Sequence, residues 1–110
     1  MTTLEQQHAT AYEILGTLLA RGYDGARMEL GGGGIAEVTA PLPDNKHTGN
    51  PQQIRFSSYV CDCLFVEQYD GEEWAAVWYL PSEQIKTTRA IWLQTAKFLD
   101  ALEAELGGEK

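Results

Sequence analysis

The chain has 110 residues, of which 44% are hydrophobic and 22% charged, and its 16 acidic and 8 basic residues give a formal charge of −8. This length and composition predict one globular domain and exclude a disordered tail, a collagen-like chain and a repeat array. The longest apolar runs, such as residues 74–80, are too short for a membrane-spanning helix of roughly 20 residues, so no membrane association is predicted.

The N-terminus and the cysteines bear on the cellular compartment. Residues 1–7 contain neither the basic nor the apolar segment of a secretory signal. The two cysteines, Cys61 and Cys63, are two positions apart in an apolar run. On a strand their Cα atoms would lie roughly 6.5–7 Å apart, which is at the limit of disulfide geometry. We therefore expect reduced thiols and a cytoplasmic protein.

The first quarter of the chain is typical of an amphipathic helix. It is predicted to begin near residue 4, where Thr2 and Thr3 each open a capping-box pattern, and to end at Gly22. Its apolar residues recur at intervals of three and four, and Gly16 within it is expected to permit close approach of another backbone. Two short strands, 27–30 and 35–40, are then predicted to form a hairpin around glycines 31–34.

The remaining chain is predicted to be strand and then helix. Its predicted elements are a loop at 41–52, a strand at 53–58, a central strand at 59–69, a returning strand at 74–80 and a helix from 82 to about 106. The central strand is apolar on both alternating faces, as buried strands are. Asp70 and Gly71 form a turn signal before the returning strand, and Ser82 is expected to cap the last helix.

This order of elements predicts a single α+β domain over residues 1–110. It has an N-terminal helix, a mainly antiparallel sheet of four or five strands and a long C-terminal helix. Because the strands follow one another as hairpins, the two helices are expected to cover one face of a meander sheet.

Patterns that carry catalysis or metal binding are weak. The four glycines are not followed by the G-K-[ST] of a phosphate-binding loop, and there is no G-x-S-x-G elbow. Cys61 and Cys63 with His8 and His47 could supply four zinc ligands, but two small core residues are the favoured interpretation of the cysteines. We therefore predict no catalytic residue, no metal and no cofactor.

Acidic and aromatic residues gather around the predicted turn at 70–73. The eight basic residues are scattered, with no two adjacent, so direct binding of nucleic acid is not expected. An acidic rim beside aromatic anchors instead suits a protein partner with a basic surface. The predicted partner-binding residues are Glu67, Tyr69, Asp70, Glu72, Glu73 and Trp74.

A different function is suggested by residues 54–85, IRFSSYVCDCLFVEQYDGEEWAAVWYLPSEQI. This stretch resembles the later core of restriction-endonuclease-like PD-(D/E)XK proteins. The resemblance implies Glu37 as the strand acid and Gln53 with Arg55 as the (E/Q)xK element, with arginine where the family uses lysine. Asp62 lies on an apolar face of the predicted strand, where an unpaired carboxylate is costly, so it is expected to lie at the open end of the strand, to pair with Arg55 or Arg27, or to be a functional carboxylate in a metal or recognition site.

Three hypotheses follow from these residues. The first is a small acidic, non-catalytic protein-binding protein, such as a phage or mobile-element inhibitor of a nucleic-acid-processing enzyme (anti-CRISPR or anti-restriction) or an antitoxin. The second is a degenerate nuclease with residual metal-dependent activity, and it uses Glu37, Gln53, Arg55 and Asp62. The third is a homo-oligomeric structural protein, for example a homodimer, with Trp74 and Trp78 at a subunit interface. The lack of a catalytic motif favours the first.

Overall fold

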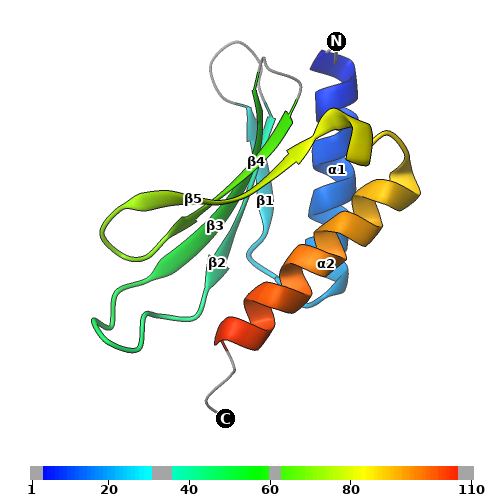
Figure 1. Ribbon diagram of the computed structural model, residues 1–110. Coiled ribbons are helices and arrows are strands. Elements are labelled where there is room, and N and C mark those ends of the chain that lie inside the picture. Colours follow the sequence, from blue (N-terminus) through cyan, green and yellow to red (C-terminus); the bar gives the residue numbers. More distant parts are fainter. Residues whose placement is uncertain (1–3, 31–35, 60–62, 107–110) are drawn as a thin grey trace.

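In the computed structural model, which describes residues 4–30, 36–59 and 63–106, two helices lie side by side over one face of a five-stranded sheet (Figure 1). No described element covers the opposite face. The elements are α1 (Leu4–Ala20), β1 (Arg27–Leu30), β2 (Ala36–Leu42), β3 (Gln52–Tyr59), β4 (Cys63–Tyr69), β5 (Trp74–Pro81), the 3-10 helix η2 (Ser82–Gln84) and α2 (Thr88–Leu106). The predicted α+β class is confirmed.

The strand order in the sheet follows the chain, β1-β2-β3-β4-β5, and each neighbouring pair is antiparallel. The sheet is therefore the meander that the sequence predicts, with β1 and β5 at its edges. Its uncovered face is free to carry polar and aromatic side chains, as one face of an antiparallel sheet commonly does.

Alternate residues of the strands face the helices and form the core. On β3, Ile54 and Phe56 are fully buried, whereas Arg55 between them belongs to the opposite face. Phe98 of α2 packs edge-on against Phe56, with ring centroids 5.8 Å apart. The core also contains Ile14 and Leu18 from α1, Val38 and Ala40 from β2, Leu64 and Val66 from β4, Leu80 from β5, and Leu99 and Leu102 from α2.

Helix α1 ends as predicted. Gly22 has a φ of 94°, and its N–H donates to the Leu19 carbonyl at 3.1 Å, while the Tyr23 N–H donates to the Leu18 carbonyl at 3.0 Å. This is a Schellman motif, which satisfies the last carbonyls of the helix. The prediction for Gly16 is wrong, because a Cβ there would meet nothing within 4 Å among the described residues.

The strand predicted at 59–69 is two elements. β3 continues to Tyr59, β4 begins at Cys63, and these two residues are paired across the antiparallel strands. No glycine or proline interrupts residues 59–66, so the sequence lacks the usual sign of a turn. The apolar pattern on either side therefore resembles one continuous strand.

Two other boundaries differ from the prediction. β2 runs through Pro41 to Leu42, and because β1 pairs with β2 only as far as Thr39, Pro41 lies where one edge of the strand is free and proline is tolerated. Ser82 begins η2 rather than α2. The Thr87 hydroxyl caps α2 instead, since it accepts the Ala90 N–H at 3.0 Å.

Several sequence predictions fall on residues outside the described ranges. They concern the caps Thr2 and Thr3, the glycines 31–34, Cys61 and Asp62. Within the described ranges, neither helix is long and apolar enough to span a bilayer.

Candidate partner-binding surface

The β4–β5 hairpin brings the predicted partner-binding residues together at one end of the sheet (Figure 1). Tyr69 and Trp74 are cross-strand neighbours that close the hairpin. Their ring centroids lie 5.3 Å apart with the planes tilted by 38°, a geometry typical of favourable aromatic pairs. The acids Asp70, Glu72 and Glu73 occupy the loop between them.

Arg55 of β3 joins this group. It lies opposite Glu67 on β4, and its Nη2 and Nε donate to Glu67 Oε1 at 2.9 and 3.1 Å. The guanidinium carbon lies 4.0 Å from the centre of the Trp74 ring, which is a cation–π contact. The side chains of Arg55 and Glu67 are only 25% and 21% exposed. The guanidinium is therefore held between a carboxylate and an aromatic ring on the uncovered face.

Asp70 organises the hairpin loop. Its Oδ1 accepts the backbone N–H groups of Glu73 at 3.0 Å and Glu72 at 2.9 Å. These two bonds favour the ionised form and hold the pKa of Asp70 below its usual range. The Asp70 carboxylate thus fixes the loop, whereas the side chains of Glu72 and Glu73 project from it.

The β2–β3 loop, residues 43–51, packs against this hairpin loop. Asn45 Nδ2 donates to the Asp70 carbonyl at 3.2 Å, and the Asn45 N–H donates to the Asn50 carbonyl at 2.8 Å. Gly71 has a φ of 104° and lies so close to Asn50 that a Cβ would clash with it. The two loops therefore form one packed end of the sheet.

Glu72 and Glu73 differ from Glu67 and Asp70, whose carboxylates accept hydrogen bonds within the hairpin surface region. Both are exposed, and within the described residues their carboxylates have no hydrogen-bond or ion-pair partner. We call the whole group the hairpin surface: Arg55, Glu67, Tyr69 and Trp74 form its packed centre, and Glu72 and Glu73 are its free charges.

The residues of the nuclease hypothesis are spread along two strands. Glu37 lies on β2 opposite Ser57, and Gln53 lies on β3 opposite Tyr69. Arg55 is engaged by Glu67, and Asp62 is outside the described residues. In the described part of the chain, no three His, Cys, Asp or Glu side chains are grouped so as to hold a metal ion. The nuclease hypothesis stays a prediction.

The two tryptophans predicted for a subunit interface lie in different surroundings. Trp74 packs under Arg55, whereas Trp78 stacks on Phe98 of α2, with centroids 4.9 Å apart and planes 18° apart. The register shifts between Val66 and Glu67, which pair with Trp78 and Ala76. Val77 is thus an extra residue that changes the alternation of β5, and the two rings do not form one surface.

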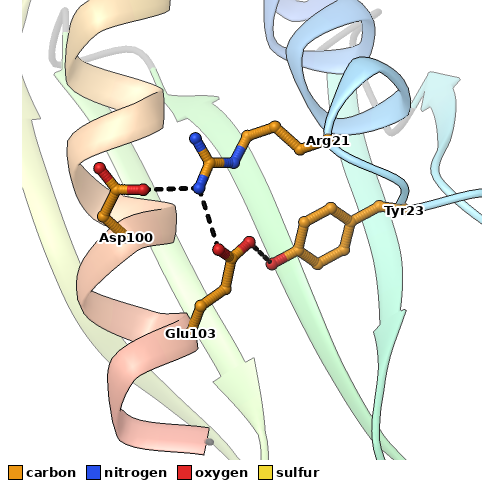
Figure 2. Close-up of polar contacts among 4 residues, drawn as sticks. All are labelled: Arg21, Tyr23, Asp100 and Glu103. Atoms are coloured by element: carbon orange, nitrogen blue, oxygen red, sulfur yellow. Dashed lines mark hydrogen bonds and ion pairs between the residues drawn. The ribbon is translucent and has the colours of Figure 1, made fainter.

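A second polar cluster ties the end of α1 to α2 (Figure 2). Arg21 Nη2 donates to Asp100 Oδ1 at 2.5 Å and to Glu103 Oε1 at 2.9 Å, and the Tyr23 hydroxyl donates to Glu103 Oε2 at 2.7 Å. Burial, aided by the bond to Glu103, raises the pKa of Tyr23. Arg21 thus neutralises the charges of Asp100 and Glu103, and these contacts hold the end of α1 against α2.

No protein-family model, no curated protein and no solved structure matches this chain. Among the described residues, the hairpin surface combines aromatic rings with free charge on the uncovered face of the sheet.

Proposed function

We propose that this chain is a protein-binding protein that docks its hairpin surface onto a basic surface of a partner. The observation that carries the proposal is the packed cluster of Arg55, Trp74 and Tyr69 with Glu72 and Glu73 free beside it. A packed aromatic centre with a charged rim is the usual composition of a protein-binding site.

The two parts of the surface have different roles in docking. The free carboxylates of Glu72 and Glu73, within a chain of formal charge −8, attract a basic partner and raise the rate of encounter. The rings of Tyr69 and Trp74 are already ordered by Arg55 and by each other. They therefore lose little side-chain entropy when they are buried against the partner.

The partner class that fits best is a nucleic-acid-processing enzyme. Such an enzyme presents a groove of lysines and arginines that neutralises phosphates, and a small domain with free carboxylates can occupy that groove in place of the nucleic acid. The chain would then act in the cytoplasm as an inhibitor, of the kind that phages and mobile elements use against restriction or CRISPR enzymes, or as an antitoxin.

The test begins with capture of the partner from host lysate by the tagged full chain, followed by purification of that partner. Its dissociation constant is then measured for the wild type and for the double variant Glu72→Lys/Glu73→Lys. We expect binding of the double variant to be about tenfold weaker or more at low salt, and the difference to shrink as salt screens the charges.

The matched control is Glu5→Lys/Glu83→Lys, which makes the same change in net charge elsewhere. Glu5 lies in the first turn of α1, and Glu83 lies beyond the far end of β5, roughly 25 Å from the hairpin loop along the strand. Equal losses in both double variants would overturn the proposal. Mg²⁺- or Mn²⁺-dependent cleavage of nucleic acid by the wild type, lost in Asp62→Asn, would instead support the nuclease hypothesis.

A further inference from the structure

The two edges of the sheet are built differently. Edge strand β1 has four residues, and its Arg27 and Glu29 form an ion pair with Nε and Oε1 2.6 Å apart. A short, charged edge resists pairing with another strand. β5 has eight residues, WAAVWYLP, with no charge among them, and its Val77 and Tyr79 are 44% and 55% exposed. The bulge at Val77 and the terminal Pro81 leave residues 74–76 and 78–80 as the two regular stretches of this edge that are open to a further strand.

A groove runs beside β5, between it and α2, which both lie at the front of Figure 1. It has a volume of about 430 Å³. Trp78 of β5 and Phe98 of α2, which stack on each other, both contribute to its wall. Among its other lining residues on α2 are Lys97, Ala101 and Glu105.

Two of these α2 residues, Lys97 and Glu105, carry opposite charges and lie symmetrically on either side of Ala101. Lys97 and Glu105 each lie four residues from Ala101, which is roughly 6 Å along a helix on either side. Within the described residues neither side chain has an ion-pair partner. Ala101 is small and exposed, so another helix can approach closely at that point.

We propose that a second copy of this chain occupies the β5 edge and the groove beside it. A two-fold axis between the copies pairs β5 with the second β5 in antiparallel fashion and joins the two sheets. The same axis places the two α2 helices antiparallel on one side of the joined sheet. Lys97 then faces Glu105 of the second copy, and Glu105 faces its Lys97. Such an isologous contact closes on itself and yields a dimer.

This dimer does not depend on the docking of a basic partner. The hairpin surface lies at the start of β5, so antiparallel pairing puts the two hairpin surfaces at opposite ends of the joined strands. They are separated by roughly the length of an eight-residue strand, about 25 Å. A dimer could therefore engage two sites of one target and gain affinity through avidity.

The test is sedimentation velocity of the full chain over a range of micromolar concentrations. We expect the wild type to approach twice its 12.2 kDa mass. Lys97→Glu and Glu105→Lys each place like charges opposite one another, so each alone is expected to weaken dimerisation about tenfold or more. The double variant, and an equimolar mixture of the two single variants, are expected to restore it, because both re-create opposite charges across the axis.

The matched control is the swap Arg27→Glu/Glu29→Arg on β1, which is expected to leave the dimer unchanged. Circular dichroism melts verify that each variant is folded, and Val77→Lys on the β5 edge gives a second disruption that does not involve the helix. If the wild type stays monomeric at every concentration, the proposal is overturned, and the β5 edge becomes a candidate site for a strand of another protein. Single variants that neither mixing nor the double swap rescues also overturn it.

Discussion

Trp74 is the residue on which the docking proposal depends most. Its ring contacts both the Arg55 guanidinium and the Tyr69 ring, and preorganised aromatic anchors dominate binding energy. We expect Trp74→Ala to weaken binding of the captured partner about 30-fold or more, or about 2 kcal/mol. Tyr12→Ala on α1 is the control, because Tyr12 is 60% exposed on the helical layer. An equal effect of the two substitutions in a calorimetric titration would contradict this role.

Alanine substitutions at two glycines of the α1 region, Gly16 and Gly22, are expected to change the stability of the fold in opposite directions. Gly16 is inside α1, where a Cβ meets nothing within 4 Å among the described residues, so Gly16→Ala should stabilise the fold by about 0.5–1 kcal/mol. Gly22 has a φ of 94° at the end of the same helix. Gly22→Ala should destabilise the fold by about 1–2 kcal/mol, since alanine disfavours that conformation. Urea denaturation measures both, and a destabilising Gly16→Ala would contradict this explanation.

At the scale of elements, the Tyr23–Glu103 bond predicts a pH dependence of the contact between α1 and α2. Burial and the bond to Glu103 raise the pKa of Tyr23 in the folded state above its unfolded value of about 10. The folded state therefore holds this proton more tightly. The stabilisation that the Tyr23–Glu103 bond contributes is therefore fully present below about pH 10, and it is lost as the pH rises toward the pKa of Tyr23 in the folded state.

The variant Tyr23→Phe tests this linkage. At neutral pH it should lower the free energy of unfolding by about 0.5–1.5 kcal/mol, the usual contribution of one hydrogen bond. The difference from the wild type should narrow above pH of about 10, because the variant has no phenol to ionise at this position. Urea midpoints at several pH values measure the difference, and a gap that stays constant into the alkaline range would show that Tyr23 does not titrate in this way.

Most of the elements could be predicted because their signals are local. The Schellman ending at Gly22 and the Asp70–Gly71 hairpin depend on residues close together in the sequence. The break between Tyr59 and Cys63 could not be predicted, since no glycine or proline marks it. Even the α2 cap was ambiguous, because Ser82 and Thr87 are both chemically suited to capping.

The candidate site was only partly predictable for a related reason. Its residues on the β4–β5 hairpin are close in sequence, and their clustering followed from the turn. Arg55 is 12 residues from Glu67, and only the register of β3 against β4 brings them together. That register depends on where β3 ends, so the sequence alone associated Arg55 with the nuclease motif instead.

At the scale of the whole molecule, the two helices cover one face of the sheet and leave the other face and the β5 edge available (Figure 1). The Arg21 cluster and the Trp92–Glu13 bond, 2.7 Å long, hold the helical layer together. Binding functions are therefore proposed for the hairpin surface and for the β5 edge with the groove between β5 and α2, whereas the polar contacts described between the helices stabilise the fold.

The measurement that tests the docking proposal most directly is the footprint of the captured partner on the isotope-labelled chain, from backbone NMR shifts. The proposal predicts the largest changes at residues 53–55 and 67–76, which include the hairpin surface, and small changes in α1. Changes confined to α1 and the outer face of α2, with the hairpin surface unaffected, would contradict it.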